Sequence, residues 1–152
     1  GTYDGGKEKA PAAISRKVAL SLDGDEIEIW GDGKQTRSFM YVDDCVEGLV
    51  RIMASDYCDA LNLGTEELVT IDELVDLVCE VADKRLRRRH NLEGPQGVRG
   101  RNSDNSRLRH ILGWEPSISL RQGLKHTYPW IEEELRRAGR KADQKDVLAI
   151  PA

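Results

Sequence analysis

The spacing of apolar residues changes along the first third of the chain. Apolar residues recur every four positions over 11–22, which predicts a helix, and every second position over 26–30, which predicts a strand. A cluster of turn-forming residues at 31–34 leads to a second expected strand over 38–42. The apolar positions of the expected helix are Ile14, Val18 and Leu22.

Two further helices are expected on either side of a short strand over 60–63. Asp43 is placed to cap the first helix. Thr70 and Glu73 have the spacing of a capping box, which opens the second. The apolar faces consist of Val46, Leu49, Val50 and Met53 in the first helix, and of Leu74, Leu77, Val78 and Val81 in the second.

The next segment combines a strand, a loop and a short helix. A strand or an extended segment is expected over 85–92 and a glycine-rich basic loop over 93–101. Asp104 is placed to cap a helix that stops at Gly113, because glycine readily adopts the left-handed conformation that ends helices.

A long helix is expected near the end of the chain. Ser119 and Gln122 form a second capping box, which opens it. Pro129 lies inside this helix and should kink it, since proline lacks an amide proton and clashes with the preceding turn. Residues 139–152 show no period, and we expect a loose tail there.

This order of elements predicts an α/β domain in which small mixed sheets are covered by helices. We expect it to occupy residues 1–138. No G-x-G-x-x-G motif follows an expected strand, so we expect no dinucleotide-binding unit within the 152 residues.

Composition and charge exclude several classes of protein. Hydrophobic residues make up 39% and charged residues 33% of the chain, which is typical of a soluble globular domain. No apolar run approaches the roughly 18 residues of a membrane span. The net charge of -4 argues against nucleic acid or an anionic membrane as partner.

The cysteines point to a reduced protein. Cys45, Cys58 and Cys79 are an odd and widely spaced set, which excludes a disulfide framework and a closed metal site. We expect Cys45 and Cys79 to pack in the core. With no apolar leader among these residues, we expect a cytoplasmic protein.

Lys9 is the first candidate for chemistry. It lies just before the expected helix over 11–22, where the positive end of the helix dipole favours the neutral amine and suits proton exchange near neutral pH. The alternative is a solvated surface lysine.

Two polar segments are candidates for ligand binding. Residues 35–37 present an amide, a hydroxyl and a guanidinium after a turn; the alternative is a hairpin with ordinary polar edges. Arg99 and Arg101 alternate with glycine, which lets the backbone approach a phosphate while the guanidinium groups bind its oxygens; the alternative is a mobile basic loop. The basic run 84–90 is interpreted as a solvated face, because it lacks aromatic platforms for nucleic acid.

Five motifs together resemble the second half of the extended short-chain dehydrogenase/reductase enzymes, the NAD-dependent nucleotide-sugar epimerases and dehydratases. These motifs are WGDG at 30–33, QTRSF at 35–39, VDD at 42–44, NLG at 62–64 and LGWEP at 112–116. Within that family, three segments are similar to the GDP-mannose 3,5-epimerases: GGKEKAPAA at 5–13, CVEG at 45–48 and GPQGVRGRNSDN at 94–105. The resemblance ends near residue 138, and Pro129 departs from it.

The resemblance implies an enzyme that binds NAD in an N-terminal Rossmann domain. Such an enzyme oxidises the sugar at C4, exchanges protons at C3 and C5, and returns the hydride to C4. By motif, Lys9 corresponds to the catalytic lysine, and Arg101 is expected near the diphosphate. The implied substrate-binding residues are Lys17, Gln35, Thr36, Arg37 and Arg101.

The resemblance also implies that this chain is incomplete on its own. The catalytic cysteine and the Tyr-x-x-x-Lys pair of the family belong to the absent half, and none of the three cysteines here takes that role. We expect this chain alone to be inactive, to bind no NAD, and to expose a face where the Rossmann domain packs. The full-length enzyme is expected to be a homodimer. The alternatives are a different nucleotide-sugar epimerase or dehydratase, and a non-catalytic sugar-nucleotide binding module.

Overall fold

The computed structural model describes residues 3, 8–94 and 98–140. Within these residues, five helices and five short strands form the mixed α/β fold expected from the sequence. The tail expected over 139–152 lies almost wholly outside the described residues. The order of elements along the chain is α1 (Ala10–Leu20), β1 (Glu26–Trp30), β2 (Thr36–Arg37), α2 (Val42–Met53), β3 (Val69–Thr70), α3 (Ile71–Val81), β4 (Arg87–Asn91), β5 (Gly100–Arg101), α4 (Ser106–Leu112) and α5 (Leu120–Arg137).

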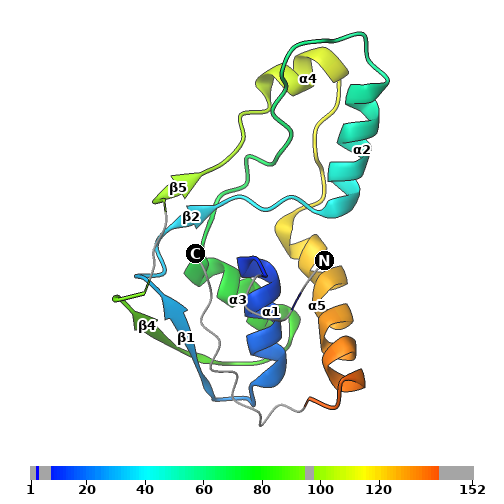
Figure 1. The fold of residues 1–152 in the computed structure, drawn as a ribbon. Coiled ribbons are helices and arrows are strands. Elements are labelled where there is room, and N and C mark those ends of the chain that lie inside the picture. The colour runs from blue at the N-terminus through cyan, green and yellow to red at the C-terminus, as the bar shows by residue number, and fades with distance from the viewer. Residues whose placement is uncertain (1–2, 4–7, 95–97, 141–152) are drawn as a thin grey trace.

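The strands form two small sheets. β1 pairs in parallel with β4, and β2 lies between β3 and β5, antiparallel to the first and parallel to the second. In Figure 1, α1, α3 and α5 gather beside the β1–β4 pair, while α2 and α4 lie at the other end, beyond the three-stranded sheet. The short strands of that sheet therefore lie between the two groups of helices.

The main core lies where α1, α3 and α5 pack together behind β1. Ile14, Ile29, Leu74 and Val78 are almost completely buried there. α1 begins one residue and ends two residues earlier than expected, and Leu22, which lies beyond its end, is 55% exposed.

Both capping boxes are confirmed. Thr70 Oγ1 accepts a bond from the amide of Glu73, and the Glu73 carboxylate accepts one from the amide of Thr70. Ser119 and Gln122 do the same at the start of α5, which continues through Pro129 to residue 137. Gly113 ends α4 with a φ of +58°.

Two strand predictions are wrong. The strand expected over 38–42 is replaced by β2, two residues earlier, and Val42 already belongs to α2. β1 and β2 form no hairpin, because β1 pairs with β4 and β2 with the other sheet. The segment 60–63 is not a strand, because it pairs with none of the described strands. The carbonyl of Gly64, which follows this segment, accepts a hydrogen bond from the side chain of Asn105.

The predicted caps of α2 and α4 are also corrected. Tyr41 is the N-cap of α2, so Asp43 lies inside the first turn and does not cap it. Asn105 is the N-cap of α4, although the Asp104 carboxylate does accept a bond from the amide of Ser106. The N-cap of α2 thus lies two residues before the expected position, and the N-cap of α4 lies one residue after it.

The basic run 84–90 is more than a solvated face. Lys84 Nζ donates to the carbonyls of Val18, Ala19 and Ser21, at 2.8, 3.1 and 2.8 Å. The ammonium therefore caps carbonyls at the end of α1, where Val18 O also accepts a bond from the amide of Ser21, and its charge suits the negative end of the helix dipole. Burial lowers the pKa of Lys84.

We expect Lys84→Met to lower the free energy of unfolding by about 1.5–3 kcal/mol, the range for hydrogen bonds made by a charged group. The methionine keeps the apolar stem and removes all three bonds. Urea unfolding of the chain measures the change. Arg85→Met, at an exposed neighbour, is the control and should change stability by less than about 0.5 kcal/mol. Equal effects at the two positions would show that the capping bonds add no stability.

Candidate functional site

The structure brings the two predicted ligand-binding segments together on neighbouring strands. β2 and β5 pair so that Thr36 faces Gly100 and Arg37 faces Arg101. The amide of Thr36 also donates to the carbonyl of Arg99, at 2.9 Å. Segments separated by more than 60 residues in the sequence thus meet at a single ladder.

Gly100 lies close to the Thr36 side chain in this pairing. A Cβ atom at this position would lie 2.6 Å from Thr36 Oγ1, closer than real Cβ atoms approach. The alternation of glycine and arginine, interpreted above as a way to approach a phosphate, therefore also serves strand pairing.

Arg37 and Arg101 lie opposite each other in the register, so their side chains leave the sheet toward the same face. Arg37 is half-buried and donates to the carbonyl of Thr36 at 2.8 Å, while Arg101 is exposed. Within the described part of the chain, neither guanidinium has an ion pair. Like charges directly opposite each other destabilise a sheet unless something compensates them, so this pair suits an anion.

Arg99 differs from its neighbour Arg101. Its Nη1 atom lies 2.9 Å from Asp32 Oδ2, in the turn that precedes β2. Asp32 Oδ1 also accepts a bond from the amide of Lys34 at 2.9 Å. This main-chain bond first, and then the bond from Arg99, lower the pKa of Asp32 below its usual range.

The turn before β2 is hydrogen-bonded to the start of α3. The amides of Ile71 and Asp72 donate to the carbonyls of Gln35 and Gly33, at 3.2 and 3.0 Å. Gly33 has a φ of +71°, and a Cβ atom there would overlap the Asp72 carboxylate. The turn leading to Thr36 is therefore held by contacts that only glycine permits.

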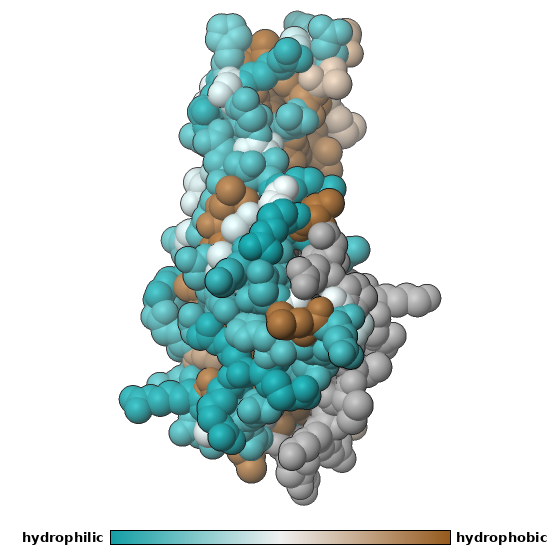
Figure 2. All heavy atoms as spheres, turned by 90° about the vertical axis from the view of Figure 1, so that its left-hand side faces the viewer, coloured by the Kyte–Doolittle hydropathy of each residue, from teal (hydrophilic) through white to brown (hydrophobic). Residues whose placement is uncertain are grey.

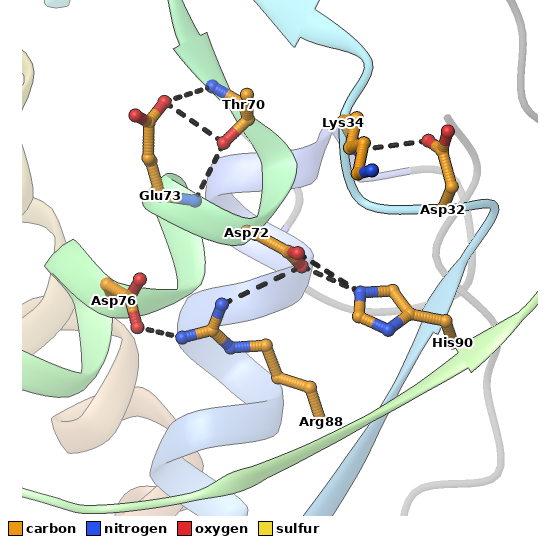
Figure 3. Close-up of polar contacts among 8 residues, drawn as sticks. All are labelled: Asp32, Lys34, Thr70, Asp72, Glu73, Asp76, Arg88 and His90. Carbon is orange, nitrogen blue, oxygen red and sulfur yellow. Dashed lines mark hydrogen bonds and ion pairs between the residues drawn. The ribbon is translucent and has the colours of Figure 1, made fainter.

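Asp72 continues this network toward β4. His90 Nε2 lies 2.9 Å from Asp72 Oδ1, and Arg88 forms ion pairs with Asp72 and Asp76 (Figure 3). The face that carries the strand edges is mainly hydrophilic (Figure 2), which suits a polar ligand. Arg88 is therefore bound to α3 and, through Asp72, contributes to holding the turn before β2.

Two of the predicted substrate-binding residues are buried. Gln35 is 3% exposed and its Nε2 atom donates to the carbonyl of Trp30 at 3.1 Å, while Oε1 has no hydrogen-bond partner in the described residues. Lys17 is 7% exposed, and its ammonium donates to the carbonyl of Glu28 at 3.0 Å. Both side chains connect to the main chain of β1 or its end.

Lys9 is the N-cap of α1, as the sequence predicted, and its side chain is exposed. The described contacts do not join it to Arg37 or Arg101. Directly before it, Glu8 is buried and paired with Arg16 of α1. Sequence reasoning missed this pair, because two charged residues eight positions apart carry no local signal.

Other residues of the recognised motifs have structural roles. Asp44 is buried, and its Oδ2 atom accepts bonds from the amides of Ser117 and Ile118 at 2.9 and 2.8 Å. Asn105 is buried and donates to the carbonyl of Gly64 at 2.8 Å. These bonds hold α2 and α4 to the loops beside them.

The described residues contain no cluster of His, Cys, Asp and Glu that suits a metal ion. Cys79 packs partly buried against the core, where burial raises the pKa of its thiol; Cys45 is half-buried and Cys58 is exposed. Within the same described ranges, no helix has the length and apolar character needed to cross a membrane.

Comparison with known proteins gives consistent relatives. The model of the GDP-mannose 4,6 dehydratase family matches residues 4–127. The GDP-mannose 3,5-epimerase of Arabidopsis thaliana is 46% identical over 97% of this chain and 38% of its own length. GDP-mannose 3,5-epimerase 1 of Oryza sativa is also 46% identical, over 90% of this chain and 35% of its own length. The chain thus spans little more than a third of these relatives.

The fold has counterparts among solved structures. UDP-glucose 4-epimerase from Thermotoga maritima, solved with UDP-glucose, has a TM-score of 0.74 and 28% identity, over 88% of this chain and 42% of its own. A GDP-6-OMe-4-keto-L-xylo-heptose reductase from C. jejuni has a TM-score of 0.77 at 23% identity, over 88% of this chain and 50% of its own, and supports the fold alone.

Proposed function

We propose, from the premise that this chain belongs to the NAD-dependent epimerase/dehydratase family of extended short-chain dehydrogenase/reductase enzymes, that it is the nucleotide-sugar-binding part of a GDP-mannose 3,5-epimerase. The observation that carries the proposal is the register of β2 and β5. It sets Arg37 beside Arg101, with no carboxylate paired to either among the described residues. A diphosphate placed between them would accept forked hydrogen bonds and relieve their repulsion.

Each predicted site residue has a proposed part. Arg37 and Arg101 bind the diphosphate, and Thr36 lies next to them on β2. Gln35 and Lys17, which are both buried, support the site through their hydrogen bonds to the main chain of β1. Lys9 exchanges a proton with the sugar, since it is exposed at a helix start. GDP-mannose is favoured as substrate because the 46%-identical plant relatives are GDP-mannose 3,5-epimerases.

NAD does not fit the described residues of this chain. Dinucleotide binding needs a parallel strand, a glycine-rich turn and a helix whose start receives the pyrophosphate. Here β1 ends in a turn that leads to β2, and the described helices do not begin at such a turn. The solved UDP-glucuronic acid 4-epimerase of Bacillus cereus does contain NAD. We therefore assign the oxidation and reduction steps to a separate dinucleotide-binding domain, and ligand binding and proton exchange to this chain.

The surface of α2 offers a place for that domain. The apolar side chains that the sequence predicted on one helix face are exposed: Val46 54%, Leu49 50%, Val50 59% and Met53 83%. Val42, the first residue of the same helix, is 59% exposed as well. An exposed apolar stripe of this kind marks an interaction surface. We propose that the dinucleotide-binding domain of the same cytoplasmic, homodimeric enzyme packs against it, because the matched relatives are about two and a half times as long as this chain.

A ligand panel tests the proposal. We expect GDP-mannose and GDP to bind this chain at least about tenfold more tightly than UDP-glucuronic acid, the difference that one well-placed hydrogen bond to the base makes. Isothermal titration calorimetry measures all three, and NAD should give no measurable heat.

Other results of this ligand panel would favour other functions for the chain. Tighter binding of UDP-glucuronic acid would favour a different nucleotide-sugar enzyme; UDP-glucuronic acid decarboxylase 2 of A. thaliana is 39% identical over 73% of this chain. GDP-mannose binding without turnover, in a protein completed by a dinucleotide-binding domain, would indicate a non-catalytic module. Micromolar NAD binding by the chain alone would contradict the division of roles.

A further inference from the structure

We propose that the ion pair between Glu8 and Arg16 positions Lys9, an inference that rests on the proposed acid–base role of this lysine. Glu8 directly precedes Lys9, and Arg16 lies inside α1. Glu8 Oε1 accepts a bond from Arg16 Nη2, and the two side chains are 1% and 0% exposed. The pair therefore ties the segment that leads to Lys9 to the helix that follows it.

Stability alone does not explain a buried pair at this position. Removing two charges from water is costly, and apolar side chains of similar volume often hold a core together as well or better. The second oxygen of Glu8, Oε2, is also buried and has no hydrogen-bond partner among the described residues. A buried pair with this cost is better explained by the geometry that it imposes.

That geometry concerns the main chain of Lys9. On one side of the residue, Glu8 is fixed by Arg16. On the other, the Lys9 carbonyl accepts a bond from the amide of Ala13 at 3.0 Å, and Pro11 restricts the first turn of the helix. The backbone is thus held from both sides while the ammonium remains exposed and able to reach a ligand.

Arg16 is a rigid point of attachment. It is the largest completely buried side chain of the described residues, and its helix packs against α3 and α5. Its neighbours Ile14 and Val18 are also completely buried. A proton-transferring group must be held within a fraction of an ångström of its productive position, and attachment to a packed helix meets that need better than a loop.

The test uses an enzyme in which this chain is joined to a dinucleotide-binding domain, such as that of the A. thaliana relative. The double variant Glu8→Gln/Arg16→Met removes the pair without leaving a buried unpaired charge. We expect kcat to fall about tenfold or more, since misplacement by about 1 Å can cost up to 10²-fold. KM for GDP-mannose should stay within about twofold, because no binding group is lost. Deuterium uptake from solvent into the sugar should fall in parallel with kcat.

The matched control is Glu80→Gln/Arg121→Met, which removes an exposed ion pair between α3 and α5. It should leave kcat and deuterium uptake unchanged. If the first double variant does not fold, Arg16→Lys replaces it. An ammonium lacks the planar geometry with which the guanidinium Nη2 reaches Glu8 Oε1, and kcat should fall at least about threefold at constant KM.

Lys9→Met separates this inference from the proposed function. If Lys9→Met abolishes activity but the Glu8 and Arg16 variants keep full kcat, the pair is structural only and the inference is overturned. If Lys9→Met leaves kcat and deuterium uptake intact, the proposed role of Lys9 fails, and positioning by the pair fails with it.

Discussion

Replacing Lys9 by methionine is expected to lower kcat at least ~10²-fold in an enzyme that contains this chain and a dinucleotide-binding domain. A positioned acid or base typically contributes 10²- to 10⁴-fold, which sets the roughly 100-fold lower limit. Methionine keeps the length of the side chain and removes the proton-carrying amine. Lys9 is exposed at the N-cap of α1, so the substitution should not disturb the core.

Steady-state kinetics and deuterium uptake from solvent into GDP-mannose measure the effect. Uptake reports proton exchange directly, so it should be lost together with kcat while KM changes much less. Lys125→Met, at an exposed position on α5, is the control and should retain full activity. An increase in KM at unchanged kcat would identify Lys9 as a binding residue and would refute its acid–base role.

Replacing Arg101 by alanine should weaken the binding of GDP and GDP-mannose by about 10- to 150-fold. Hydrogen bonds to charged groups contribute roughly 1.5–3 kcal/mol, which corresponds to this range. GDP should lose almost as much affinity as GDP-mannose, because the contact is to the diphosphate. Arg101→Lys should recover part of the loss through charge alone, and added salt should narrow the gap between lysine and alanine.

Calorimetry with this chain is sufficient, since the variant probes binding and not turnover. Arg107→Ala is the control, because Arg107 is exposed on α4. Arg88 is unsuitable as a control, because its ion pairs with Asp72 and Asp76 support the turn before β2. Equal losses at Arg101 and Arg107 would mean that a diffuse basic surface attracts the ligand.

The sequence predicts those features that depend on neighbouring residues. The capping boxes of α3 and α5 and the stop at Gly113 are correct because each involves residues at most four apart. The strand over 26–30 is also correct, since alternation is a local signal. The segment expected to be extended over 85–92 contains β4. The motifs then identify the family, because they combine several such local features in a fixed order.

Features that depend on distant partners were not predicted. β2 is only two residues long and is defined by its neighbours β3 and β5, so no alternation could place it. The apolar face of α2 predicts a buried helix, yet the face is exposed, because its periodicity does not say what it packs against. The buried charges at Glu8 and Arg16 break the usual rule that charged residues lie at the surface.

The contacts of Lys84 bear on how the protein emerges from the ribosome. Its bonds to the end of α1 span 63 to 66 residues, and β1 meets β4 only across a similar distance. About 70 residues separate the end of α1 from the end of β4, which takes roughly 4–14 s to synthesise at roughly 5–20 residues per second. During that interval β1 has an unpaired edge and α1 lacks its terminal cap. Until β4 has been synthesised, the unpaired edge of β1 is therefore open to pairing with other chains.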